Sequence, residues 1–102
     1  MRNVLYSSEI IDTIKTKLGP AEVRVIMDAQ YDEEKGMLHG KLESFLCSPG
    51  TEKRLPRIPE FPLPDPQVIT ERVGFSEAMD LAKEIFQRAV KKTREIAWPT
   101  FK

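Results

Sequence analysis

Prolines are concentrated in one stretch of the chain, between Cys47 and Pro66, which contains six of the eight. Each proline fixes φ and removes a backbone donor, so neither a regular helix nor a central strand can run through this stretch. We expect residues 55–66 to be extended, partly polyproline-like, and to lie along the domain surface. Regular structure is therefore expected only before and after it. The six prolines are Pro49, Pro56, Pro59, Pro62, Pro64 and Pro66.

The first residues have a helical spacing of apolar side chains. Ser7 or Ser8 can cap a helix, because a serine oxygen accepts a bond from an orphaned backbone N–H. Gly19 and the proline after it can end the helix, since glycine accepts a left-handed cap and proline cannot continue the bonding. A short N-terminal helix is therefore predicted. Its apolar stripe is Ile10, Ile11, Ile14 and Leu18.

From Glu22 the apolar period changes to two, which is typical of a half-buried strand. Residues 22–31 form the first predicted strand and residues 38–46 the second. Residues 32–36 between them end in Gly36 and are expected to form a turn. We predict an antiparallel hairpin. One face of its first strand carries Val23, Val25, Met27, Ala29 and Tyr31.

After the prolines, residues 67–73 are expected to form a third short strand that Gly74 ends. Residues 76–97 then follow the three-four spacing of one amphipathic helix, capped by Ser76 and closed by Trp98 and the following proline. The apolar positions of the helix are Ala78, Met79, Ala82, Ile85, Phe86, Ala89, Val90, Ile96 and Ala97. The predicted fold is α+β, in one domain covering residues 1–102, with the long helix packed on the sheet.

Charge and composition exclude few functions. Sixteen basic residues balance sixteen acidic ones, so no net field attracts nucleic acid or a membrane surface. Cys47 is the only cysteine, which rules out an internal disulfide and a multi-cysteine metal site. The first residues contain no apolar run typical of a signal peptide. A reducing, cytoplasmic location is therefore expected.

Few residues suggest catalysis. His39 is the only histidine, and it lies on the predicted solvent face of a strand. If Cys47 were a nucleophile with His39 as its base, the eight-residue separation along a strand would place them about 26 Å apart. Neither a calcium-loop pattern nor a nucleotide-binding glycine motif is present, so we expect no metal, no cofactor and no catalytic residue.

The proline stretch is the strongest functional lead. A basic residue followed by P-x-x-P fits the peptides that bind aromatic-lined grooves. The alternative is that the apolar residues between the prolines pack on their own domain, which we favour for a long ordered loop. The candidate partner-binding residues here are Arg54, Pro56, Arg57, Pro59 and Phe61.

A second lead is the basic end of the long helix. Lys91, Lys92 and Arg94, with Trp98 nearby, could contact phosphate and stack on bases. The alternative is a solvated helix end whose cations favour the helix dipole, and Glu95 among them favours that alternative.

The expected function is therefore that of a non-catalytic interaction or accessory protein acting through protein–protein contacts. A homodimer formed through the helix or a sheet edge is one form of it, and complete coverage of the helix within the monomer is the equal alternative. A nucleic-acid-associated module using the basic helix end is the second hypothesis. A small enzyme or enzyme subunit is the third, and it depends only on His39 and Cys47.

Overall fold

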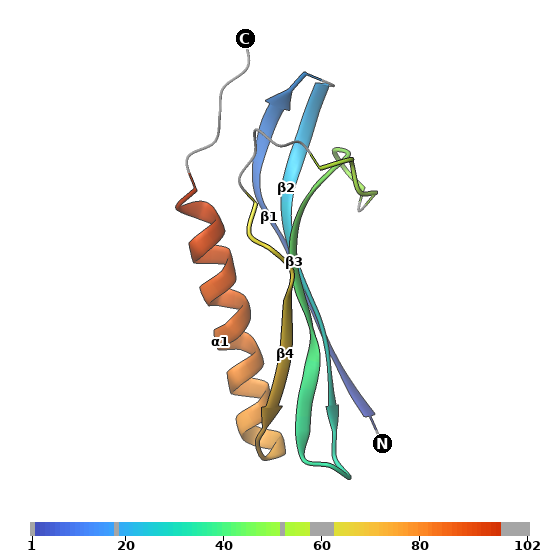
Figure 1. Cartoon of the computed structure of the whole chain (residues 1–102), viewed down its shortest axis with the longest axis vertical. Coiled ribbons are helices and arrows are strands. Elements are labelled where there is room, and N and C mark those ends of the chain that lie inside the picture. The colour runs from blue at the N-terminus through green and yellow to red at the C-terminus, as the bar shows by residue number, and fades with distance from the viewer. Residues whose placement is uncertain (1, 18, 52, 58–62, 97–102) are drawn as a thin grey trace.

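The computed structural model describes residues 2–17, 19–51, 53–57 and 63–96. They form a four-stranded antiparallel sheet in the order β1-β2-β3-β4, with one helix packed on one face (Figure 1). The α+β fold with a C-terminal helix on the sheet is thus confirmed. The strands and the helix are β1 (Arg2–Thr16), β2 (Gly19–Asp32), β3 (Met37–Cys47), β4 (Gln67–Arg72) and α1 (Phe75–Arg94).

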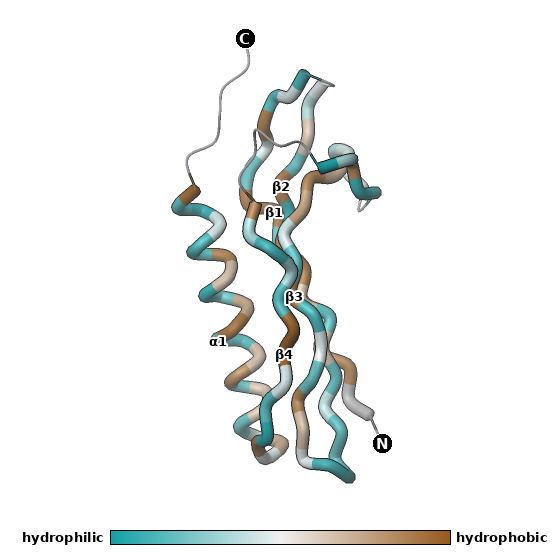
Figure 2. Tube along the Cα trace, viewed as in Figure 1, coloured by the Kyte–Doolittle hydropathy of each residue, from teal (hydrophilic) through white to brown (hydrophobic). Residues whose placement is uncertain are grey.

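Strands β2 and β3 are the predicted hairpin, and they form the centre of the sheet. Tyr31 pairs with Leu38 next to the turn, and Val23 pairs with Leu46 at the other end. The odd-numbered residues of β2 from Ala21 to Tyr31 are buried, as the alternating pattern predicted. Figure 2 shows the resulting alternation of hydrophobic and hydrophilic positions along the strands. The residues of both strands that face α1 form the sheet side of the hydrophobic core.

The predicted N-terminal helix is wrong, because residues 2–16 form the edge strand β1. Gly19 has a positive φ of 111° in the β1–β2 turn and does not cap a helix. The Thr16 hydroxyl donates to the Gly19 carbonyl at 2.8 Å across this turn. Pairing with β2 satisfies the inward-facing backbone groups along fourteen residues of β1, whereas a short isolated helix would be marginal in water.

A β-bulge explains why this strand resembles a helix in sequence. The register with β2 shifts between Ile10 and Asp12, so Ile11 is the extra residue. Leu5 packs on the core before the bulge, Ile11 does so at the bulge, and Ile14 is buried after it. The bulge thus places two residues three positions apart on one face of a strand, a spacing that normally indicates a helix.

The long helix is confirmed, with ends that differ slightly from those predicted. It begins after Gly74, whose carbonyl accepts the first bond from Ala78 N–H at 2.8 Å, and no side chain caps it. Ser76 is therefore not the cap, and Glu95 occupies the C-terminal cap position. Ala97 lies outside the described residues. The buried positions of the helix follow the predicted stripe, and they are Ala78, Ala82, Val90 and Thr93.

The helix is shorter than the sheet that it covers. Twenty residues of helix extend about 30 Å, whereas fifteen residues of strand extend about 50 Å. The molecule is accordingly elongated, at 52 × 23 × 18 Å. The main core lies under α1, and a second, smaller cluster lies beyond its C-terminal end. We call this second group the tip cluster; it comprises Ile14, Ala21, Val23, Leu46 and Leu63.

Part of the proline stretch covers the tip cluster. Leu63 is 9% exposed and belongs to the cluster, and Leu55 packs against it. Leu55 N–H also donates to the Leu46 carbonyl at 2.9 Å, which holds the chain against the edge of β3. The polyproline-like conformation of residues 55–66 stays a prediction, since residues 58–62 lie outside the described part of the chain.

Candidate functional site

One face of the sheet has no helix on it, because α1 covers only the other. We call it the helix-free face, and its residues alternate with the buried ones along each strand. Its central residues come from β1, β2 and β3. An antiparallel sheet normally leaves one face to solvent, and that face is then polar. Here it also carries large apolar side chains, so its composition resembles that of a binding surface.

Three exposed apolar residues of the helix-free face lie on the edge strand β1. Val4 is 64% exposed, Tyr6 51% and Ile10 43%. Because all three are even-numbered and precede the bulge at Ile11, they point to the same side of the sheet. A fourth exposed residue on this face, Val68, is 74% exposed and lies on the opposite edge strand, β4.

A groove of about 540 Å³ crosses the middle of the helix-free face. Its lining combines apolar side chains with acidic, basic and amide side chains. No single charge type dominates, which distinguishes the groove from a phosphate-binding surface. The lining residues are Tyr6, Ile26, Asp28, Gln30, His39, Gly40, Lys41, Glu43, Phe45 and Arg54.

Arg54 is one of the residues that line this groove. Its guanidinium lies 4.3 Å from the centre of the Phe45 ring, a cation–π contact, and its Nη1 is 2.6 Å from Glu43 Oε2. The hydrogen bond from Arg54 lowers the pKa of Glu43, and the same bond raises the pKa of Arg54. The carboxylate therefore stays ionised and occupies the arginine, which reduces the attraction of Arg54 for an external anion.

The loop after β3 positions Arg54. A bridge pairs Cys47 with Arg54, and Ser48 N–H donates to the Lys53 carbonyl at 3.1 Å. Gly50 N–H donates to the Glu22 carboxylate at 2.8 Å, which fixes the loop to β2. These bonds hold the arginine over the face rather than leaving it on a free loop.

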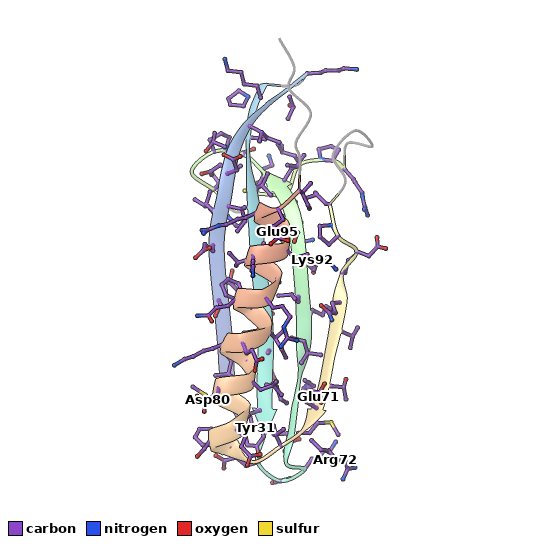
Figure 3. The ribbon with its side chains drawn as sticks, turned by 90° about the vertical axis from the view of Figure 1, so that its left-hand side faces the viewer. Tyr31, Glu71, Arg72, Asp80, Lys92 and Glu95 are labelled. Atoms are coloured by element: carbon purple, nitrogen blue, oxygen red, sulfur yellow. The ribbon has the colours of Figure 1, made fainter. Side chains whose placement is uncertain are left out.

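A second groove, of about 780 Å³, lies between α1 and β4, and we call it the helix–β4 groove. It exists because α1 lies over β1, β2 and β3 and leaves β4 beside it (Figure 3). Its apolar walls are made by Leu42, Ile69, Leu81, Ile85 and Ala89. The Ser44 and Thr93 hydroxyls are 3.3 Å apart at its wall, and the labelled residues Lys92 and Glu71 border it (Figure 3).

The two groups of predicted partner-binding residues are not brought together. Arg54 lies on the helix-free face, whereas Lys91, Lys92 and Arg94 lie on α1 on the other side of the sheet. Arg94 contacts Glu9 of β1 at 2.9 Å. Pro56 is exposed, and Arg57 donates to the Leu63 carbonyl at 3.2 Å. Pro59, Phe61 and Trp98 lie outside the described residues.

His39 and Cys47 do not form a catalytic pair. Both belong to β3, eight residues apart, and Cys47 is buried with its thiol 3.6 Å from the Glu22 carbonyl. Across residues 2–17, 19–51, 53–57 and 63–96, no three His, Cys, Asp or Glu side chains gather as metal ligands would. His39 is instead one of the polar residues of the groove on the helix-free face.

Sequence reasoning missed most of this face. Tyr6, Ile26 and Asp28 were not candidates, although the predicted outward position of His39, Lys41 and Glu43 is correct. The missing signal was the pairing register, since only the register shows which outward residues of three strands become neighbours.

Comparison with protein-family models, with curated proteins and with solved structures finds no significant match to this chain. Within the described part of the chain, α1 does not combine the length and apolar character that crossing a bilayer requires.

Proposed function

We propose that this chain is a non-catalytic interaction or accessory protein that presents the helix-free face of its sheet to a protein partner. The observation that carries the proposal is the exposed apolar set on β1 beside a groove with charges of both signs. Exposed apolar side chains with a polar surround are characteristic of protein interfaces. The cytoplasmic, reducing setting expected from the single cysteine is part of the same proposal.

Charge distribution favours a protein over a nucleic acid as the partner. A polyanion needs uncompensated cations along one surface. On the helix-free face, Lys41 and Arg54 alternate with Asp28 and Glu43, and Arg54 is held by Glu43. The basic residues at the end of α1 lie on the other side of the sheet, so they do not add to this surface. A mixed-charge partner surface fits this arrangement better.

Site-specific photo-crosslinking in the source cells tests the proposal. A photoreactive amino acid at Lys41 lies in the groove, and the same amino acid at Lys83 lies on the solvent side of α1. Both positions are exposed lysines, so the pair is matched for accessibility. We expect protein adducts from position 41 that are absent from position 83.

Two results would contradict the proposal. Equal adducts from the two positions, or none from position 41, would show that the helix-free face is not the contact surface. Adducts that a nuclease removes would instead favour the nucleic-acid hypothesis.

A further inference from the structure

The outer edge of β1 is the longer of the two outer edges of the described sheet. Strand β1 pairs with β2 on one side, and within the described residues no strand pairs with its other side. Figure 3 shows β1 at the margin of the sheet. An edge strand of this length is a template on which another strand can add. Proteins commonly protect such an edge with proline, charged side chains or a bulge; residues 4–10 of β1, before the bulge, contain no proline and one charged residue, Glu9.

The bulge at Ile11 limits how far a regular partner strand can extend. Regular alternation holds on β1 up to Ile10, and the register shifts after it. Within the regular segment, four residues point to the helix-free side: Val4, Tyr6, Ser8 and Ile10. The first and last residues of this set, Val4 and Ile10, are aliphatic.

We propose that β1 pairs antiparallel with β1 of a second copy of the chain, about a two-fold axis at Ser7. This register places Val4 opposite Ile10 and Tyr6 opposite Ser8, and it maps the four outward residues onto themselves. The pairing covers residues 4–10, about 24 Å of strand, and stops before the bulge. The inference rests on the proposed function, because it names a second copy as a protein partner and places the contact at the β1 edge of the helix-free face.

Self-complementarity is the reason for choosing a second copy. A two-fold contact uses the same surface on both subunits, so each residue must fit the residue that the axis places opposite it. In the Ser7-centred register, two exposed aliphatic residues cover each other twice, and no two like charges face each other. Glu9 falls opposite Leu5, and its carboxylate stays with its own Arg94 at 2.9 Å.

The other edge of the sheet serves as the internal control. Strand β4 has six residues, and Pro66 immediately before it cannot donate a backbone bond. Val68 is the most exposed of the large apolar residues on this face and lies on β4. A substitution there changes the same kind of surface without touching β1.

The test is a charge exchange across the symmetric pair, measured as the dimer dissociation constant by light scattering and analytical ultracentrifugation. We expect the unmodified chain to form dimers. Val4→Lys and Ile10→Glu should each weaken the dimer about tenfold, because each symmetric dimer then contains the mismatched pair twice. Mixing the two variants should restore a heterodimer, which has one Lys–Glu pair and one native Val–Ile pair. Val68→Lys should leave the constant unchanged.

Each other outcome would overturn the inference. A monomer at all accessible concentrations excludes the β1 dimer, while protein adducts at position 41 would still support the proposed function. Weakening by Val68→Lys alone assigns the contact to β4. Weakening by both β1 variants without rescue on mixing refutes the Ser7-centred register. Circular dichroism and thermal unfolding of each variant verify that the exposed substitutions leave the fold intact.

Discussion

Replacement of Leu63 by alanine removes the side chain that extends the core beyond the helix. Leu63 is 9% exposed and lies in the tip cluster, so its three lost carbon atoms are almost fully buried. At about 0.8 kcal/mol per buried methylene, plus a small cavity term at a site that can partly collapse, we expect a loss of about 2–3 kcal/mol. Urea denaturation followed by circular dichroism measures this loss.

Val68→Ala is the matched control for that experiment. Val68 is exposed on β4, and its truncation should change the free energy of unfolding by less than about 0.5 kcal/mol. Hydrogen exchange gives a second measurement, because Leu63→Ala should deprotect the amides near the β1–β2 turn more than those under α1. A loss below about 0.5 kcal/mol for Leu63→Ala would refute the conclusion that residue 63 stabilises the tip.

Two further substitutions test local features of the sheet. Gly40→Ala should lower the free energy of unfolding in urea by about 3 kcal/mol or more, since its new Cβ would overlap the backbone of Ala29, whereas Gly74→Ala meets open space and should cost at most about 1 kcal/mol. Equal losses would contradict this reasoning. Glu43→Gln should destabilise the fold at neutral pH by less than about 1 kcal/mol, because the pair with Arg54 is solvent-exposed. The hydrogen bond from Arg54 lowers the pKa of Glu43 below its ordinary 4.5, so the stabilisation is present above that pH. This stabilisation is lost as the pH falls through the folded-state pKa of Glu43. The difference in thermal unfolding between the unmodified protein and Glu43→Gln should therefore disappear in acid. A difference that does not change with pH would contradict this reasoning.

Local periodicity was sufficient to predict the centre of the fold. The alternation from Val23 to Tyr31 lies in a strand covered on one face only, so each residue's burial follows its parity. The stripe along α1 likewise lies on one face, because the helix packs on one sheet. In both elements the local pattern and the tertiary environment agree.

The N-terminal strand could not be predicted in this way. Ile11 and Ile14 face the same side only because Ile11 lies in a bulge, and a bulge has no signature in one sequence. The helix start was misplaced for a related reason, since Ser76 looks like a cap while Gly74 occupies that position without a side-chain bond. Pairing with β2 decided the structure of the N-terminal strand.

The candidate site was predicted only in part. The solvent-side position of His39 follows from alternation on β3, but the neighbours of His39 depend on β1, which was assigned to a helix. Arg54 was selected for the P-x-x-P pattern, whereas the structure holds it over Phe45 by a hairpin-like loop. That Arg54 contacts a partner stays a prediction.

The unequal edges of the sheet have a consequence for assembly. If both edges accepted strands equally well, each added copy would offer a new edge, and the contact would propagate into an open fibre. Here one edge is the fifteen-residue β1 and the other is the six-residue β4, which Pro66 precedes. An association that uses β1 twice consumes both long edges and leaves only the two short ones outside. The same geometry that permits a pair of chains therefore also ends their growth at two.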